Sequence, residues 1–244
     1  MDEIISRGII IKQSAYGDAH RMLSLFTADS GIIKAVRYGI KGKKTSNAAS
    51  FQFLCYGDFR LRPSGGGIMT AVSADITDGF YPISEDIQKL ALMSYLADIT
   101  YRILGEGNPD TRILRLFLNS AYAAAYRSEP IMKLKAVYEF KAMCAGGYMP
   151  DLSACVECGG SGEYFSLEKG VLVCSAHRKG NDVRLDGNIL AAMRYLRTCD
   201  DRKMLSFSMS DENYFSMLGD ISEKYVSLHC DKEFKSLSYF KSML

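Results

Sequence analysis

The chain has 244 residues, of which 48% are hydrophobic and 24% are charged. This composition is typical of a globular protein and excludes an intrinsically disordered one. The formal net charge is only +2, so charge alone does not indicate a polyanionic partner. No apolar run is long enough to span a membrane, and the start MDEIISRG lacks the features of a signal peptide. Seven cysteines without an export signal predict a reducing, cytoplasmic location.

Residues 1–81 contain short apolar, β-branched runs separated by turn signals. The predicted strands lie in EIISRGIIIKQ, RMLSLFTADSGIIKAVRYG, FQFLCYGDFRLR and GIMTAVSADITDGFY. The second of these holds two runs divided by Asp-Ser-Gly, which favours a turn. Five closely spaced strands without a helical period indicate a small barrel or sandwich, and the length fits a five-stranded OB-fold barrel.

A basic segment lies within this region. Between Gly31 and Gly57 there is no Asp or Glu, whereas five basic residues are present: Lys34, Arg37, Lys41, Lys43 and Lys44. Basic side chains at this density attract phosphates, and an aromatic residue among them, Tyr38, can stack on exposed bases. The segment therefore predicts nucleic-acid binding, with a solvated charged loop as the alternative. Its glycine spacing does not fit a P-loop.

Helical patterns begin after Pro82. Ser84 is a predicted N-cap, followed by carboxylates in the first turn and apolar residues at helical spacing. Further helices are predicted over residues 110–127, 130–146, 188–198 and 211–229. The predicted fold class is therefore α+β: an OB-fold barrel (1–81) followed by an all-helical domain in two parts (82–150 and 183–244).

An insertion at 151–182 interrupts this helical domain and contains the stretch CVECGGSGEYFSLEKGVLVCSAH. Its two ligand pairs are Cys155 with Cys158 and Cys174 with His177. Their spacing matches two zinc-binding turns, with a hairpin turn at 168–170 bringing the pairs together. Four protein ligands fill a tetrahedral Zn²⁺ and leave no position for a water nucleophile, so one structural zinc is predicted. Ordinary cysteines with a surface His177, or a different fourth ligand, are the alternatives.

The sequence contains no recognisable catalytic motif. Neither G-x-S-x-G nor H-E-x-x-H occurs, and the deaminase pattern lacks its H-x-E. The two histidines outside the insertion, His20 and His229, are predicted to be structural. The chain is therefore expected to be a binding protein rather than an enzyme, with no small-molecule substrate.

Four segments, in order and at matching separations, resemble the RecO family of recombination mediators over nearly the full chain. They are YGDAHRMLSLFTADSGIIKAVRYGIKG, ADITDGFYPISEDIQKLALMSYLADI, YEFKAMCAGGYMPDLSACVECG and AMRYLRTCDDRKMLSFSMS. The third, with its Gly-Tyr-x-Pro-x-Leu-x-x-Cys-x-x-Cys-Gly run, is the most specific.

The resemblance implies a protein that binds single- and double-stranded DNA and anneals complementary strands. It also implies that the protein acts with RecR to load RecA onto DNA covered by single-stranded-DNA-binding protein. The basic residues that match the family's basic loop are Arg37, Lys41, Lys43 and Lys44, with Lys34 as a strand neighbour. The matching zinc ligands are Cys155, Cys158 and Cys174, whereas His177 stands where zinc-bearing members usually have a fourth cysteine.

A mediator of this kind must also reach strands already covered by the single-strand-binding protein, by holding that protein's acidic C-terminal tail. A helical groove with basic residues at its mouth suits such a peptide, and the candidates are Arg112, Arg115, Lys133 and Lys135. An RNA-binding translation or ribosome-assembly factor, and a zinc-stabilised scaffold that binds only proteins, are the alternative functions.

Overall fold

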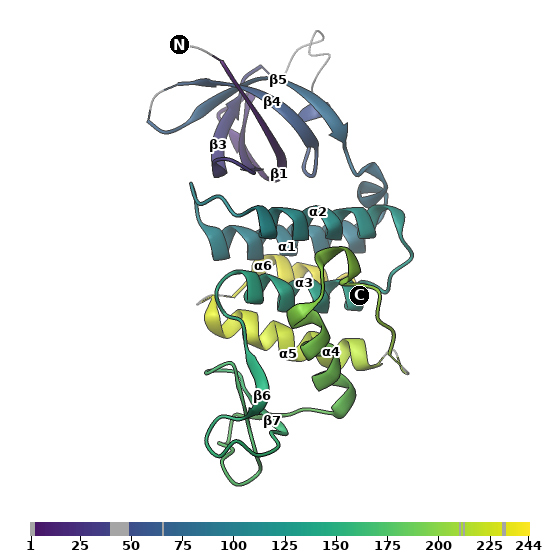
Figure 1. Cartoon of the computed structure of the whole chain (residues 1–244). Coiled ribbons are helices and arrows are strands. Elements are labelled where there is room, and N and C mark those ends of the chain that lie inside the picture. Colours follow the sequence, from purple (N-terminus) through teal and green to yellow (C-terminus); the bar gives the residue numbers. More distant parts are fainter. Residues whose placement is uncertain (1–2, 40–48, 65, 210, 212, 231–232) are drawn as a thin grey trace.

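The computed structural model describes residues 3–39, 49–64, 66–209, 211, 213–230 and 233–244. The N-terminal part is a closed barrel with strand order β1-β2-β3-β5-β4, in which β4 pairs back onto β1 (Figure 1). The strands are β1 (Ile4–Tyr16), β2 (His20–Thr27), β3 (Gly31–Arg37), β4 (Tyr56–Pro63) and β5 (Met69–Asp78). All pairs are antiparallel except β3 with β5. This is the five-stranded OB-fold barrel that the sequence predicts.

The apolar run in β1 serves two cores because successive side chains of a strand point to opposite faces. Ile10 lies inside the barrel with Leu23, Phe59 and the short 3₁₀ segment η1 (Ala49–Phe51). Its neighbours Ile9 and Ile11, together with Phe26 and Ile32, belong to the larger core of the helical domain. The outer face of β1–β3 therefore rests on the helices, and the run has no polar alternation because both of its faces are buried.

The chain leaves the barrel through the 3₁₀ helix η2 (Tyr81–Glu85) and enters α1 (Ile87–Leu104). The predicted N-cap Ser84 is wrong: its hydroxyl donates to the Tyr81 carbonyl within η2. Asp86 caps α1 instead, since its carboxylate accepts the amides of Gln88 and Lys89 at 2.9 and 3.2 Å. The 3₁₀ turn thus contains Ser84 and the first carboxylate that the capping pattern assigned to the helix, and the apolar residues from Ile87 onward lie in α1.

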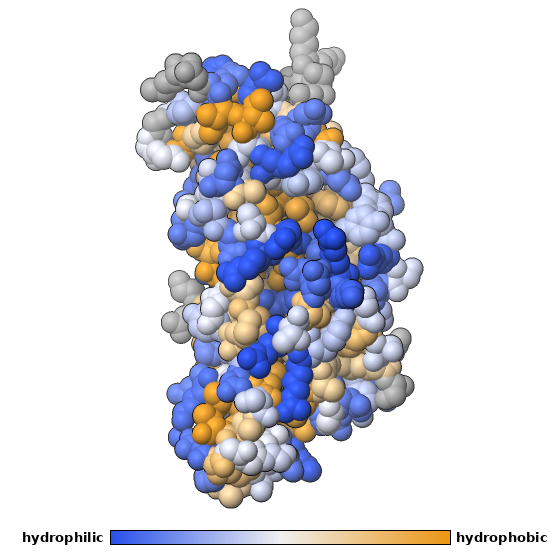
Figure 2. All heavy atoms as spheres, viewed as in Figure 1, coloured by the Kyte–Doolittle hydropathy of each residue, from blue (hydrophilic) through white to orange (hydrophobic). Residues whose placement is uncertain are grey.

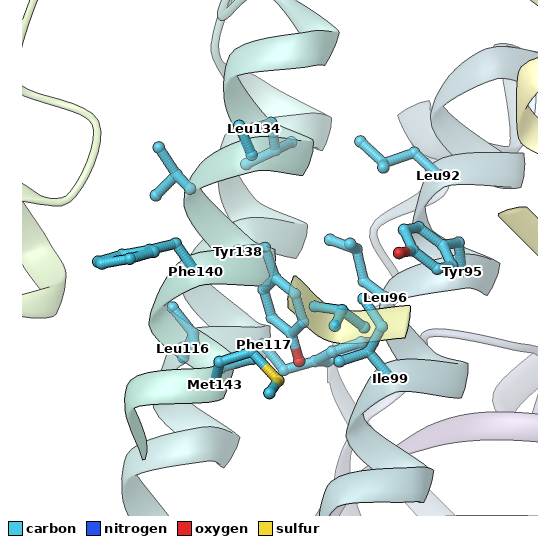
Figure 3. Packing of buried hydrophobic residues seen from close by; sticks show 14 of the residues in the cluster. Leu92, Tyr95, Leu96, Ile99, Leu116, Phe117, Leu134, Tyr138, Phe140 and Met143 are labelled. Atoms are coloured by element: carbon cyan, nitrogen blue, oxygen red, sulfur yellow. The ribbon is translucent and has the colours of Figure 1, made fainter. Parts of the chain in front are cut away.

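The helical domain places its helices below the barrel in Figure 1. The remaining helices are α2 (Thr111–Tyr126), α3 (Ile131–Ala145), α4 (Gly187–Thr198), η3 (Asp201–Lys203), α5 (Asn213–His229) and the short α6 (Lys235–Lys241), which the sequence analysis did not predict. Figure 3 shows side chains of α1, α2 and α3, among them Leu96, Phe117 and Tyr138, converging in the core. Helix α3 is central: every residue from Lys133 to Met143 is buried. No helix among the described residues is long and apolar enough to cross a membrane.

The insertion after α3 forms a small four-stranded sheet of order β6-β8-β7-β9. Its strands are β6 (Asp151–Cys155), β7 (Tyr164–Ser166), β8 (Val171–Val173) and β9 (Val183–Arg184). The predicted hairpin is β7–β8, turning at residues 167–170. We call the segment 151–182 the knuckle, and it lies at the end of the molecule opposite the barrel (Figure 1).

Candidate metal centre and nucleic-acid interface

The four predicted metal ligands meet in the knuckle. One ligand atom from each of Cys155, Cys158, Cys174 and His177 lies within 4.8 Å of all the others. The Sγ atoms of Cys158 and Cys174 are 3.9 Å apart, and the Nδ1 atom of His177 is 3.2 Å from the Sγ of Cys174. Sulfurs about 3.8 Å apart are what a tetrahedral ion with Zn–S bonds of about 2.3 Å requires. The cluster can therefore hold one metal ion.

Strand pairing brings the two ligand pairs together. β6 and β8 run parallel, so the turns that follow each strand lie side by side. In the first turn the Gly159 amide donates to the Cys155 carbonyl at 2.8 Å, and in the second the His177 amide donates to the Cys174 carbonyl at 3.1 Å. Backbone hydrogen bonds in each turn thus fix the separation of two ligands, and the sheet fixes the separation of the pairs.

The ligand side chains also polarise one another. The hydrogen bond between Cys174 and His177 lowers the pKa of the thiol and raises the pKa of the imidazole. Thiolate is the form that binds metals. Three cysteines and one histidine form a donor set found in structural zinc sites, and all four positions around the ion would be taken. The chemistry of the residues fits zinc in a structural role.

The knuckle is attached to the helical domain by a few specific contacts. Phe165 packs on Tyr225 of α5 with ring centroids 5.4 Å apart, and the Tyr225 hydroxyl donates to the Tyr148 carbonyl at 2.9 Å. Arg194 of α4 donates to the Leu152 carbonyl at 2.8 Å. The Nε2 atom of His229 lies 2.9 Å from the Leu167 carbonyl oxygen. These contacts place the knuckle between α3 and the two later helices.

The predicted basic segment is described only in part. Lys41, Lys43 and Lys44 lie outside the described residues. Lys34 forms an ion pair of 2.6 Å with Glu106, in the loop after α1, so it faces the helical domain. Arg37 donates to the carbonyls of Ala71 and Val72 at 3.2 and 2.8 Å, and its guanidinium lies 4.7 Å from the centroid of the Phe51 ring. Both described side chains are therefore engaged within the molecule.

An exposed aromatic and basic cluster lies next to Arg37. Tyr16 pairs with His20 across the β1–β2 turn, and Arg21 pairs with Arg37 across β2–β3. The His20 and Tyr38 rings meet edge to face at 4.8 Å, and Tyr16 and Tyr38 are 43% and 46% exposed. We call Tyr16, His20, Arg21 and Tyr38 the barrel tip. The sequence analysis considered Tyr38 alone, because cross-strand register is what brings the other three beside it.

Two of the four predicted partner-binding residues share a cleft. Arg112 and Arg115 of α2 line a cavity of about 280 Å³ together with Arg197 of α4 and the apolar side chains of Ala145 and Met149. Arg112 is paired with Asp110 at 2.7 Å, whereas no ion pair is found for Arg115 or Arg197 in the described part of the chain. Arg197 was missed because only the packing of α4 places it beside α2.

The prediction that Lys133 and Lys135 line the mouth of a groove is corrected by their burial. These side chains are 8% and 1% exposed. The Lys133 ammonium binds Glu129 and the Leu205 carbonyl, both at 2.8 Å. Lys135 binds Glu139 and Glu223, both at 2.9 Å. A charge that is neutralised inside a core is not presented to a partner, so the candidate groove keeps only Arg112 and Arg115.

The chain is a two-domain protein. It joins a closed OB-fold barrel to a helical domain, and the helical domain carries a Cys/His cluster in an inserted knuckle. The sequence profile described as Recombination protein O N terminal matches residues 1–80, and Recombination protein O C terminal matches residues 84–238. The chain belongs to the RecO family of DNA repair proteins.

Relatives align over the whole chain. The DNA repair protein RecO of Acetivibrio thermocellus is 28% identical, with 100% of this chain and 98% of the relative aligned. The proteins of that name from Caldicellulosiruptor saccharolyticus and Alkaliphilus metalliredigens are 24% and 25% identical, over 99% and 98% of this chain and 99% of each relative. The resemblance stated from sequence segments is thus confirmed at both domains.

Proposed function

We propose that the protein is a non-enzymatic recombination mediator located in the cytoplasm. In this proposal it binds single- and double-stranded DNA, anneals complementary strands and, with RecR, helps to load RecA onto DNA covered by single-stranded-DNA-binding protein. The observation that carries the proposal is the RecO family match across both domains, on a chain whose first domain is an OB-fold barrel. OB folds bind nucleic acids on strand surfaces and loops.

The barrel tip supports DNA binding. Exposed tyrosines beside an arginine can stack unpaired bases while the cation attracts phosphates. Arg21 of the tip pairs with Arg37 across β2–β3, and Arg37 is the described member of the predicted basic segment next to the tip. Annealing breaks no covalent bond. A cationic surface lowers the repulsion between two phosphate backbones, and bases that are only stacked remain free to pair.

The cleft between α2 and α4 supports binding of an acidic tail. Arg115 and Arg197 supply positive charge to its lining, and Met149 and Ala145 supply apolar surface. Asp200 and Asp201 also line it, and Asp201 is paired with Lys141 at 3.0 Å. A short peptide that ends in apolar residues and carries carboxylates complements such a site. In this proposal the tail of the single-strand-binding protein docks there, which brings the barrel to the covered strand.

In the same proposal, the metal site has a structural role and stabilises the knuckle. Cys155, Cys158, Cys174 and His177 would hold one zinc ion, which would cross-link the two turns of the knuckle. The knuckle then fixes the connection between α3 and α4. No step of annealing requires the metal, because its four positions are filled by protein atoms.

The test is the rate at which the purified protein anneals two complementary oligonucleotides coated with single-strand-binding protein, without ATP and at several salt concentrations. We expect acceleration that fades as salt rises. Arg21→Gln should lower the rate, and in a separate DNA-binding titration it should reduce the slope of log Kobs against log[salt] by about 0.7–0.9 per lost phosphate contact. Arg62→Gln is the control, since Arg62 also lies on the barrel but is paired with Glu3 at 2.6 Å. No acceleration at any salt, or a preference for structured RNA, would contradict the proposal.

A further inference from the structure

Two large aromatic side chains on α2 are uncovered. Tyr122 and Tyr126 are 49% and 48% exposed, and their rings lie 5.2 Å apart at an interplanar angle of 58°. They are four residues apart, so they occupy one face of the helix, which Arg115 and Asn119 continue toward its N-terminus. Leaving two neighbouring tyrosines in water is unfavourable for an isolated domain, so this face is suited to a ligand.

Free positive charge borders the two rings. The Arg127 guanidinium lies 5.7 Å from the centroid of the Tyr122 ring. Arg127 and the exposed Arg202 of η3 line a cavity of about 310 Å³ with Tyr122 and Asn119. Within the described ranges, neither arginine has an ion-pair partner. We call Tyr122, Tyr126, Arg127 and Arg202 the α2 platform.

Two carboxylates contact or line the α2 platform, and both have partners within the molecule. Asp201, which lines the same cavity, pairs with Lys141 at 3.0 Å. Asp78 accepts the hydroxyl of Tyr126 at 2.8 Å. Among the charged residues that line the cavity, the two arginines have no ion-pair partner in the described part of the chain, whereas Asp201 is neutralised by Lys141. Figure 2 shows a strongly hydrophilic region over the middle of the helical domain on the face that carries α2.

The α2 platform is continuous with the barrel. Asp78 is the last residue of β5, so its bond to Tyr126 joins the end of α2 to the end of a barrel strand. Phe80, the next aromatic residue of the chain, packs against Tyr126 with ring centroids 6.2 Å apart. The barrel tip lies toward the other end of β5, since Val36, next to Arg37, pairs with Thr70. A single strand that occupies both sites would therefore run along the length of β5 before it reaches α2.

We propose that the α2 platform is a second nucleic-acid site, which takes a single strand. Unpaired bases would stack on Tyr122 and Tyr126, and Arg127 and Arg202 would bind the phosphates between them. A duplex keeps its bases stacked on one another and cannot use the rings, so the site selects single strands. This inference rests on the proposed function and deepens it: one protein would hold a strand on the barrel and extend it along α2, beside the proposed tail cleft.

The experiment measures binding of fluorescent oligo(dT) of 10 and 30 nucleotides to the full-length protein by anisotropy. An OB fold covers about 4–16 nucleotides, so dT10 reports on the barrel and only dT30 can also reach the α2 platform. The variants are Tyr122→Leu and, independently, Arg202→Gln, with Arg21→Gln as the barrel variant. Tyr239→Leu is the matched control, because Tyr239 is 48% exposed on α6. Melting temperatures verify that each variant is folded.

We expect Tyr122→Leu to weaken dT30 binding about fivefold or more, as the loss of one stacked base predicts. We expect dT10 and duplex affinity to be unchanged. Equal dT30 affinity in wild type, Tyr122→Leu and Arg202→Gln would overturn the inference, while retained dT10 binding would leave the proposed function standing. If the wild-type protein binds neither oligonucleotide, that result would contradict both this inference and the proposed function. If an acidic peptide binds to wild type but not to Tyr122→Leu, while both variants bind dT30 as wild type does, the surface would be assigned to a protein partner instead.

Discussion

The helical core and the knuckle are ordered by different means. Helix α3 has eleven consecutive buried residues, and it packs among α1, α2 and α5 in one continuous apolar cluster. The knuckle has strands of two to five residues and contributes only Leu152, Phe165 and Leu172 to that cluster. The core is therefore ordered by apolar burial, whereas the knuckle contains little apolar surface and, in the proposed function, is ordered by a metal ion on its four ligands. The two regions should therefore respond differently to loss of the metal ligands and to loss of buried partners in the core.

Removal of one metal-ligating side chain is expected to have the largest effect on stability. We expect the loss of order to be confined to the knuckle. Structural zinc contributes about 10–16 kcal/mol of apparent binding free energy in small zinc-dependent units. Cys155→Ser, or a chelator, should therefore abolish hydrogen-exchange protection in residues 151–182 while α1–α3 stay protected. We expect stability and solubility to fall more than the intrinsic affinity for DNA.

Cys199→Ser is the control for this change. Cys199 is a half-buried cysteine of the helical domain, 3.7 Å from the Lys141 ammonium and not part of the ligand cluster. It should leave knuckle exchange unchanged. Unchanged protection in Cys155→Ser, in protein shown to hold zinc beforehand, would break the comparison between the two regions.

The buried charges of the core provide the next largest effect. Lys135 and Glu139 are 1% and 0% exposed, and the Tyr95 hydroxyl donates to Glu139 at 2.7 Å. Lys135→Met leaves the Glu139 carboxylate buried without its cation. The loss of one partner of a buried pair costs about 3–5 kcal/mol. Urea unfolding should show that loss, whereas Lys169→Met in the knuckle should cost at most about 1 kcal/mol, because its pair with Glu157 is half exposed.

The destabilisation caused by Lys135→Met should depend on pH. Burial raises the pKa of Glu139 from its ordinary value of 4.5 to about 7. A carboxyl whose pKa is raised by folding stabilises the native state at low pH, and this contribution is lost as pH rises from 4.5 toward 7. Lys135 opposes that loss by lowering the pKa of Glu139. The destabilisation by Lys135→Met should therefore be larger at pH 8 than at pH 5, and a deficit that is larger at pH 5 would contradict this account.

The parts that the sequence predicts are those encoded locally. Each ligand pair lies within one turn, so the spacing of Cys155, Cys158, Cys174 and His177 sufficed to identify the cluster. Strand and helix patterns likewise placed the barrel and five of the helices. Among the α-helices of the described residues, α6 alone was not predicted, since its seven residues give too few turns for a periodic signal.

Side-chain surroundings could not be read in the same way. Charged residues spaced along α3 resemble an exposed face, and the local partners Glu129 and Glu139 fit that pattern. The other partners of Lys133 and Lys135 are the Leu205 carbonyl and Glu223. These two lie far along the chain. Charge density similarly singled out Lys34, whose partner Glu106 follows a helix 18 residues long. Burial and pairing depend on which distant elements meet, and a local pattern does not contain that information.

The contact between the knuckle and α5 should give the smallest change in stability among these predictions. Gly170, in the knuckle turn, has a φ of +65°, and a Cβ atom built there would lie 2.5 Å from the Tyr225 hydroxyl oxygen of α5. Gly170→Ala should cost about 2 kcal/mol, from the left-handed backbone and this collision. Tyr225→Phe removes the oxygen and its bond to Tyr148, at a cost of about 1 kcal/mol.

The double variant separates the two causes. If the collision contributes, Gly170→Ala will cost about 1 kcal/mol less in the Tyr225→Phe background, since only the backbone strain remains. Chemical denaturation of the four proteins of this cycle gives the coupling directly. Strict additivity would mean that α5 and the knuckle turn do not touch at this point. Support of the knuckle by the helical core would then rest on its other contacts, such as Arg194 with Leu152 and His229 with Leu167.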